Sequence, residues 1–148
     1  MDRLLLLDRQ VCFALYSAHR AMSQAYAPLL EELGVTYPQY LVLLVLWERD
    51  GQAVSELGER LRLDSGTLSP LLQRLEARGL IERRGSAGDE RKTIAHLTAK
   101  GRRLEARARR IPRAMLECAS LRLEDADQLR TRLNDLTRAL GRITEATS

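Results

Sequence analysis

The sequence of 148 residues has few cysteines and no long apolar run. Its two cysteines, Cys12 and Cys118, are too few for the disulfide framework of a small secreted protein. We therefore expect free thiols in a reducing compartment. No apolar stretch approaches the roughly 20 residues of a membrane span. The leucines at 4–7 form too short a run for the ~7–15-residue core of a signal peptide. These absences predict a cytoplasmic protein with no membrane partner.

Signals for metal and cofactor sites are also missing. The two cysteines and two histidines lack the close spacing that binds zinc, so we expect neither a metal nor a cofactor. There is no internal repeat and no low-complexity segment. The length and the hydrophobic content of 45% indicate one domain with helical extensions. The net charge of +4 favours an anionic partner, but the first fifty residues are net acidic. The positions of the charged residues are therefore more informative about the partner than the net charge is.

Residues 53–98 have the pattern of a helix-turn-helix. Ser55 is expected to cap its first helix and Asp64 its second, because both side chains accept backbone N–H groups at a helix start. Leucines then recur at helical spacing, and Gly79 ends the second helix. Pro70 conflicts with this helix, since a proline about six residues inside removes one backbone hydrogen bond.

A two-stranded wing is predicted after this helix. The extended runs 80–84 and 93–97 flank a polar, glycine-rich turn at 85–90, the pattern of a hairpin. The helix and the wing carry polar and basic side chains that suit base edges and phosphates, which predicts binding to double-stranded operator DNA. The candidate DNA contacts are Ser65, Thr67, Ser69, Gln73, Arg74, Arg78, Arg83, Arg84, and Arg91 and Lys92 at the tip.

The flanking segments, 8–50 and 99–148, predict a helical dimerisation region. A helix over 8–31 should kink or break near Pro28, and one over 99–119 should bend at Pro112. The last helix, 123–146, has a coiled-coil-like apolar seam that needs a partner surface. The predicted fold is mainly α: a winged helix-turn-helix with long N- and C-terminal dimerisation helices, in a homodimer. The seam residues are Ala126, Leu129, Leu133, Leu136, Leu140 and Ile143.

All six aromatic residues lie between 13 and 47, with Cys12 at the edge of this group. A helix N-terminus stabilises a thiolate, and tyrosine hydroxyls can donate to it. Tyr26 is 14 residues from Cys12, roughly 21 Å at ~1.5 Å per residue of helix. Unless the helix breaks, Tyr26 can reach only the cysteine of a second chain. A cysteine on an amphipathic helix is more often a buried apolar residue, so both interpretations stay open.

Several stretches resemble a known family. The wing resembles that of the MarR family of dimeric repressors through Leu80-Ile81-Glu82-Arg83, Asp89-Glu90-Arg91 and Leu97-Thr98. The chain more narrowly resembles the organic-hydroperoxide-sensing (OhrR) subfamily. The matching stretches are 8–16, 36–40 with 46–48, and 63–70, where Pro70 fits the subfamily pattern.

The resemblance implies roles for particular residues. Cys12 would be the peroxide-reactive thiol, with Tyr26 and Tyr37 of the partner subunit donating to its sulfur. Arg91 would enter the minor groove with Asp89 bracing it. Some members have a second cysteine that closes an intersubunit disulfide, and Cys118 is in the expected place. The candidate peroxide pocket is Phe13, Tyr16, Tyr26 and Tyr37.

We therefore expect a repressor, and not an enzyme, that leaves its operator when an organic hydroperoxide oxidises Cys12. Two alternatives stay open. A MarR-type repressor could instead be released by a small aromatic ligand, with Cys12 only lining the pocket. A cysteine peroxidase is disfavoured because no charged or histidine activator is close to Cys12 in sequence, and because the winged module would have no role.

Overall fold

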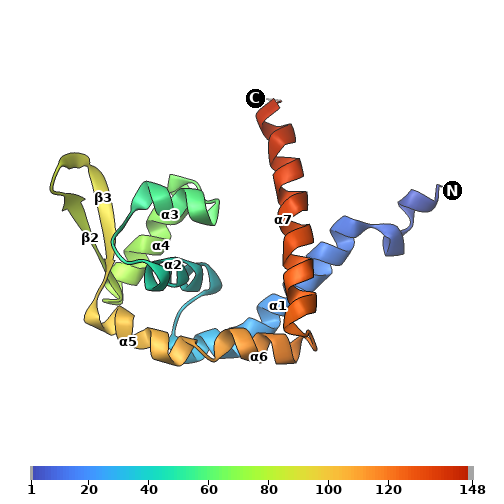
Figure 1. Ribbon diagram of the computed structural model, residues 1–148, viewed down its shortest axis with the longest axis horizontal. Coiled ribbons are helices and arrows are strands. Elements are labelled where there is room, and N and C mark those ends of the chain that lie inside the picture. Colours follow the sequence, from blue (N-terminus) through green and yellow to red (C-terminus); the bar gives the residue numbers. More distant parts are fainter. Residues whose placement is uncertain (1, 147–148) are drawn as a thin grey trace. The chain divides into compact units, whose positions relative to one another are not determined.

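The structure is a computed structural model that describes the backbone of residues 2–146 and the side chains of residues 2–89 and 91–141 (Figure 1). The chain forms two compact units, Met1–Arg110 and Ile111–Ser148. They are described in turn.

The first unit begins with two short 3-10 turns, η1 (Arg3–Leu5) and η2 (Leu7–Arg9), and the long helix α1 (Val11–Leu33). Gly34 ends α1 in the left-handed conformation, with φ of 68°. The helix continues past Pro28, so the expected break is wrong. Pro28 removes one backbone bond near the helix end, where the buried Leu30 and Leu33 hold the last turn.

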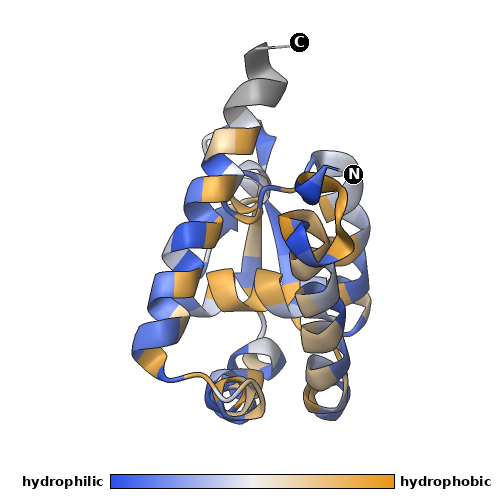
Figure 2. Cartoon of the chain, turned by 90° about the vertical axis from the view of Figure 1, so that its right-hand side faces the viewer, coloured by the Kyte–Doolittle hydropathy of each residue, from blue (hydrophilic) through white to orange (hydrophobic). Residues whose placement is uncertain are grey.

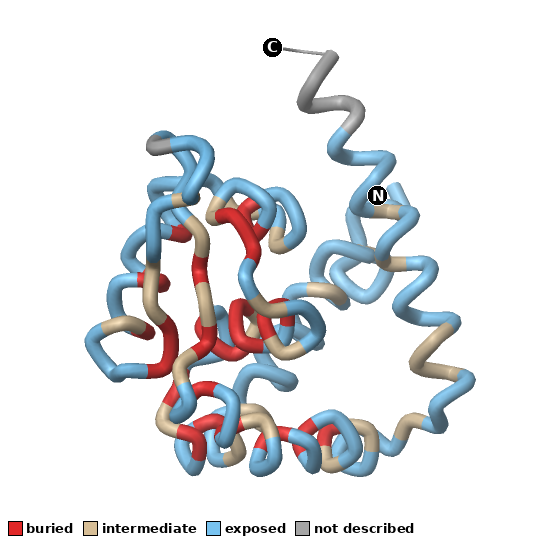
Figure 3. Tube along the Cα trace, turned by 60° about the vertical axis from the view of Figure 1, so that its left-hand side comes forward, coloured by how far each residue is buried: buried red, intermediate tan, exposed pale blue. Residues whose placement is uncertain are grey.

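Helix α2 (Tyr37–Glu48) is the centre of the core, and its sequence is apolar nearly throughout. Thr36 and Gln39 form a capping box, in which each side chain accepts the other residue's backbone N–H. Figure 3 shows that buried residues concentrate in α2 and in the elements packed against it. Val42, Leu43 and Leu46 have no exposed surface.

Strand β1 (Gln52–Ala53), helix α3 (Val54–Leu61) and helix α4 (Ser65–Ala77) follow. The expected cap at Ser55 is wrong, because α3 begins one residue before it. Ala53 is the N-cap, and its N–H donates to the Glu56 carboxylate at 3.1 Å. Asp64 caps α4 as predicted. Helix α4 runs through Pro70 without a break.

The wing consists of β2 (Ile81–Ser86) and β3 (Asp89–Leu97), paired antiparallel from Ile81 opposite Leu97 to Ser86 opposite Asp89. The turn between them is shorter than predicted. The sequence did not predict β1, which pairs with β3 and makes a three-stranded sheet in the order β1-β3-β2. This added pairing ties the wing to the start of α3.

Helix α5 (Ala99–Ala108) closes the first unit, with Thr98 as its N-cap. Gly101 packs directly on the backbone carbonyl of Leu80, where a Cβ would not fit. Its own carbonyl accepts the Trp47 indole N–H at 2.9 Å. Trp47 is therefore half-buried, with its polar edge hydrogen-bonded.

The second unit contains α6 (Ile111–Cys118) and α7 (Leu123–Ala146). The helix expected over 99–119 is divided into α5 and α6, and Pro112 occupies the first turn of α6. None of the described residues of α7 is buried, and Leu129 and Leu140 are 47% and 56% exposed. Figure 2 shows apolar residues recurring along this exposed helix. Ile143, predicted for the same seam, lies outside the described side chains.

Candidate functional site

Helix α4 presents one apolar and one polar face. Leu68, Leu71, Leu72 and Leu75 are buried against the core. The Asp64 carboxylate accepts the backbone N–H of Thr67 at 2.8 Å and its hydroxyl at 3.1 Å, and these bonds lower the pKa of Asp64. The predicted contacts on this helix are all exposed. They are Ser65, Thr67, Ser69, Gln73 and Arg74.

Arg83 anchors the wing to α4. Its backbone N–H and its Nε each donate to Glu76 at 2.9 Å, and one terminal nitrogen lies 2.7 Å from the same carboxylate. The hydrogen bond from the Arg83 side chain is the main reason that the pKa of Glu76 is lowered. Arg83 was predicted as a DNA contact, but its guanidinium is already engaged with Glu76. DNA contact by Arg83 stays a prediction, and Glu76 is a supporting residue that the sequence did not suggest.

The wing tip carries two exposed cations, Arg91 and Lys92. The Asp89 carboxylate accepts the backbone N–H of Arg91 at 3.0 Å, so it braces the strand at the residue that the resemblance places in the minor groove. Arg83, Arg91 and Lys92 also line a cavity of about 260 Å³ between the wing and Ser55 of α3. This arrangement gathers positive charge between the wing and α3, and positive charge is what a phosphate backbone requires.

Asp50 bonds both to the end of strand β3 and to helix α5. Its carboxylate accepts the N–H groups of Leu97 at 2.8 Å and of Gly51 at 2.9 Å, and it pairs with Arg102 at 2.7 Å. Burial raises the pKa of Asp50, but these hydrogen bonds and the Arg102 charge outweigh burial, so the pKa is lowered. No sequence motif pointed to Asp50, because its partners are far away in the chain.

Cys12 is the second residue of α1 and is exposed. The alternative interpretation as a buried core residue does not hold within the chain. The side chains around it are also exposed: Val11 is 65%, Phe13 41% and Tyr16 57% exposed. Helix α1 has no side-chain cap at its N-terminus, so the first N–H groups are free to stabilise an anion. Cys118, at the end of α6, is exposed as well.

Tyr26 and Tyr37 meet at the other end of α1. Their ring centroids are 4.9 Å apart, and each lies 6.3 Å from the ring of Tyr40. Burial, with the neighbouring Tyr37 and Tyr40, raises the pKa of Tyr26 to about 12, and burial raises that of Tyr37. Both phenols therefore stay protonated at physiological pH. Within the described residues neither hydroxyl has a hydrogen-bond acceptor.

The four predicted pocket residues thus fall into two groups. Phe13 and Tyr16 lie beside Cys12 at the start of α1, where Arg20 stacks on the Tyr16 ring. Tyr26 and Tyr37 lie at the joint between α1 and α2. Because α1 is unbroken from Val11 to Leu33, Cys12 cannot reach these two tyrosines in its own chain. Tyr40, which is buried in the core, is the third member of the tyrosine cluster.

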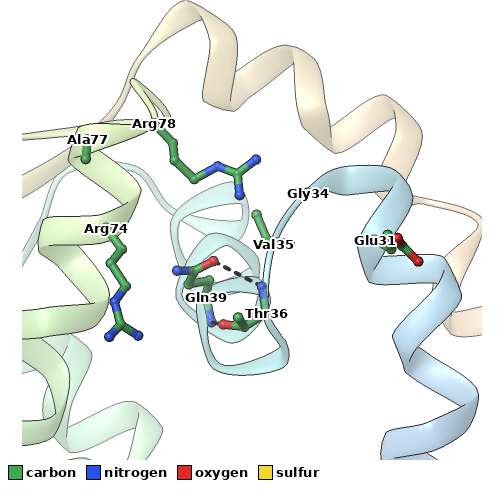
Figure 4. A pocket seen from close by; sticks show the side chains of 8 residues that line it. All are labelled: Glu31, Gly34, Val35, Thr36, Gln39, Arg74, Ala77 and Arg78. Carbon is green, nitrogen blue, oxygen red and sulfur yellow. Dashed lines mark hydrogen bonds between the residues drawn. The ribbon is translucent and has the colours of Figure 1, made fainter.

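The joint between α1 and α2 also faces α4. Figure 4 shows Arg78, at the end of α4, directed toward Gly34 and Val35 of the joint. A cavity of about 550 Å³ lies between them and includes Arg74. The residues beside Tyr37 are therefore close to the helix that carries the candidate DNA contacts.

Comparisons with known proteins agree with this architecture. Residues 24–107 match the family model described as transcriptional regulator SarA/Rot. The organic hydroperoxide resistance transcriptional regulator of Bacillus subtilis (strain 168) is 46% identical over 134 residues, which is 90% of this chain and 91% of that protein. The chain belongs to the MarR family of winged-helix transcriptional regulators.

Solved structures of AbfR of Staphylococcus epidermidis share the fold. Reduced AbfR bound to DNA has a TM-score of 0.78 and 34% identity, with 93% of this chain and 94% of AbfR covered. Disulfide-formed AbfR has a TM-score of 0.63 and 35% identity, with coverages of 94% and 92%. Reduced and disulfide-bonded states of one MarR-family protein have thus both been solved.

Among the described residues, no single helix has both the length and the apolar composition to cross a membrane. Only α1 and α2 taken together pass that test, and they are bent by 65° with α2 in the core. The described residues also hold no group of three or more histidine, cysteine or acidic side chains placed to bind a metal.

Proposed function

We propose that this MarR-family regulator is a homodimeric repressor that binds operator DNA when Cys12 is reduced and leaves it when an organic hydroperoxide oxidises Cys12. The observation that carries the proposal is the tyrosine pair. Tyr26 and Tyr37 pack together, and neither protonated hydroxyl has an acceptor among the described residues. Because α1 is unbroken, the two tyrosines cannot reach the Cys12 of their own chain. The acceptor is the Cys12 sulfur of a second chain.

The exposed apolar surface supports a dimer. The exposed apolar side chains of α1 include Val11, Phe13 and Tyr16. The apolar seam of α7 contains no buried residue among those described. Burying apolar surface yields roughly 25 cal/mol per Å². A second copy of the chain buries these surfaces and brings its Cys12 beside the tyrosine pair.

The first chemical step is an attack on the peroxide. The Cys12 thiolate attacks the terminal oxygen, the O–O bond breaks, and the leaving alkoxide takes a proton to become an alcohol. The sulfur becomes a sulfenic acid, a two-electron oxidation matched by reduction of the peroxide. Tyr26 and Tyr37 hydrogen-bond the thiolate and orient it before the attack.

The second step joins the two subunits. The Cys118 thiolate of the partner subunit attacks the sulfenic sulfur, the S–S bond forms as the S–O bond breaks, and the departing hydroxide takes a proton from solvent to become water. The existence of a disulfide-formed structure of AbfR supports a switch of this kind. Moving the regulator from mostly bound to mostly free needs a difference of roughly 5.5 kcal/mol between the two states. A disulfide that forms only in the DNA-free geometry supplies such a difference, and thiol reduction reverses it.

Binding to DNA selected in vitro by the reduced protein tests the proposal. Fluorescence anisotropy should show that cumene hydroperoxide releases the wild type and that a thiol reductant restores binding. The Cys12→Ser variant should bind equally well and stay bound. If the peroxide also releases Cys12→Ser, the thiol is not the sensor. Release of that variant by a small aromatic acid, with no peroxide response in wild type, would favour a ligand-released repressor instead.

A further inference from the structure

Arg62 has a backbone conformation that residues with a side chain disfavour. It is the C-cap of α3, with φ of 55° and ψ of 42°, in the left-handed region. Among the described residues, Arg62 and Ser120 are the only ones besides glycine with a positive φ. In this region the Cβ atom crowds the following carbonyl oxygen, so glycine is normally favoured. An arginine at position 62 therefore makes the fold less stable than a glycine would.

The turn after α3 explains the conformation but not the choice of residue. The N–H of Arg62 donates to the carbonyl of Glu59 at 3.2 Å, and the N–H of Leu63 donates to that of Gly58 at 2.9 Å. Helices that end on a left-handed residue have this pattern of bonds. A Cβ on Gly58 would lie 2.9 Å from the carbonyl oxygen of Leu63, so the turn packs directly on α3. The fold therefore fixes the backbone at position 62, and a glycine there would satisfy it.

The side chain of Arg62 makes no polar contact within the described chain. It is exposed, and it forms no ion pair or hydrogen bond with any described residue. By contrast, Arg60 on the same helix pairs with Glu48 of α2. Unfavourable backbone conformations tend to be kept where they serve a function. The guanidinium of Arg62 is therefore available to a partner outside the chain.

Arg62 lines a cavity between the two helices of the helix-turn-helix. The cavity has a volume of about 580 Å³, and its other lining residues include Ser55 at the start of α3 and Ser65 at the start of α4. Ser65 is a candidate DNA contact. It follows Arg62 by three residues, which span at most about 11 Å of chain. Arg62 is therefore close to the end of α4 at which the candidate DNA contacts begin.

Two carboxylates share this cavity with Arg62 and pair with no cation among the described residues. Asp64 is needed as the N-cap of α4, where its carboxylate accepts both hydrogen bonds from Thr67. Glu59 projects from the last turn of α3. Both negative charges would repel the phosphates of DNA that approached the start of α4. A guanidinium on the same cavity reduces that repulsion.

We propose that Arg62 contacts a phosphate of the DNA backbone beside the N-terminal end of α4. This inference rests on the DNA-binding function proposed above and adds one residue to it. Guanidinium groups bind phosphate through paired, charge-assisted hydrogen bonds. Phosphate contacts fix the orientation of a protein on the duplex without reading its sequence. Arg62 thus holds the start of α4 on the DNA, while Arg91 and Lys92 hold the wing.

Three substitutions separate the charge from the backbone conformation. Arg62→Gly removes both the charge and the strain, Arg62→Asn removes the charge with a residue that tolerates the left-handed region, and Arg62→Lys keeps both. Fluorescence anisotropy of the reduced full-length protein with its selected DNA should show about tenfold weaker binding by the Gly and Asn variants. The Lys variant should lose less affinity than either. Arg62→Gly should also raise the melting temperature by about 2–4 °C. A purely structural role of Arg62 would not combine weaker binding with higher stability.

A phosphate contact also has a salt signature. Losing one such contact should reduce the slope of log affinity against log salt concentration by about one. The affinity should fall equally on the selected DNA and on DNA of unrelated sequence, because phosphates are common to both. Titrations at several salt concentrations with both DNAs measure these effects. A loss confined to the selected DNA would mean that Arg62 reads a base and would overturn the phosphate contact.

Arg60→Gln is the matched control, because it removes the same charge from α3 at a residue that already pairs with Glu48. It should keep the wild-type affinity and salt slope. An equal loss in Arg60→Gln would show that only the net charge matters and would overturn the proposal. Wild-type affinity in both Arg62→Gly and Arg62→Asn would overturn it while leaving the DNA-binding function intact. A reduced wild type that binds no DNA would overturn both.

Discussion

Tyr26 of α1 and Tyr37 of α2 stack with their ring centroids 4.9 Å apart and their planes inclined by 50°. Gly34, which ends α1 in the left-handed conformation, and the capping box at Thr36 make this pairing possible, because they return the chain so that α2 starts beside the last turns of α1. The same joint faces Arg78 at the end of α4. A displacement of either tyrosine would therefore act next to α4, the helix that carries the candidate DNA contacts.

The tyrosine pair should control the reactivity of the thiol. Replacing Tyr26 or Tyr37 with Phe removes one hydrogen bond to the thiolate, and bonds to charged groups contribute about 1.5–3 kcal/mol. We expect each variant to slow oxidation of Cys12 by cumene hydroperoxide by about tenfold or more, measured by stopped flow, with unchanged thermal stability. Tyr16→Phe serves as the control, because Tyr16 lies outside the stacked pair. Equal rates in all three variants would show that Tyr26 and Tyr37 do not take part in the sensing step.

The Arg83–Glu76 pair should stabilise the wing. Arg83→Ala removes a half-buried ion pair and one hydrogen bond from the side chain, and we expect the free energy of unfolding to fall by about 1–2 kcal/mol. Arg84→Ala removes an exposed pair with Glu82 and should change it by no more than about 0.5 kcal/mol. Urea denaturation of the two variants measures the difference. Equal effects would show that Arg83 does not anchor β2 to α4.

Arg91 should contribute to DNA affinity without contributing to stability. Its side chain is exposed, and only its backbone is held by Asp89. Arg91→Ala should weaken binding to the selected DNA by about 1–3 kcal/mol at physiological salt. Arg132→Ala removes the same charge from α7 and should leave the affinity unchanged. An Arg91→Ala protein with wild-type affinity would place the wing tip outside the interface.

Asp50 should make stability depend on acidic pH. Its pKa is lower in the folded chain than in the unfolded chain, so its contribution is fully present above the unfolded value of about 3.9. That contribution is lost as the pH falls through the lower, folded value. Asp50→Asn should therefore be less stable than wild type at pH 7, and the gap should narrow below pH ~4. A gap that stays constant over this range would contradict the assignment.

The local features of this fold were readable from the sequence because each involves neighbouring residues. Asp64 caps its helix as predicted, since a cap needs only the three residues that follow it. The predicted cap at Ser55 is wrong because Ala53 is the N-cap. The Glu56 carboxylate accepts the backbone N–H of Ala53, so the helix starts earlier. The prediction that Pro28 would break α1 failed because buried leucines hold the helix end.

Distant pairings were not readable in the same way. Strand β1 is only two residues long, too short for any periodic signal, and it exists because β3 pairs with it. The anchors Asp50–Leu97 and Glu76–Arg83 likewise join residues without a shared motif. For the candidate site, the sequence pointed to Cys12, Tyr26 and Tyr37. The division of the pocket residues into two groups became visible only in the structure, because it depends on α1 being unbroken.

We expect Cys118 to determine whether oxidation leads to a lasting release. Cys118→Ser keeps Cys12, so the peroxide should still form a sulfenic acid, detectable by dimedone labelling. Without the second thiol no S–S bond can form, and this variant should release DNA poorly and give no dimer band on a non-reducing gel. Oxidised wild type should give that band, and mixing Cys12→Ser with Cys118→Ser should restore a single crossed bridge. A peroxide-treated wild type without a reducible dimer would rule out the disulfide and leave the sulfenic acid as the final signal.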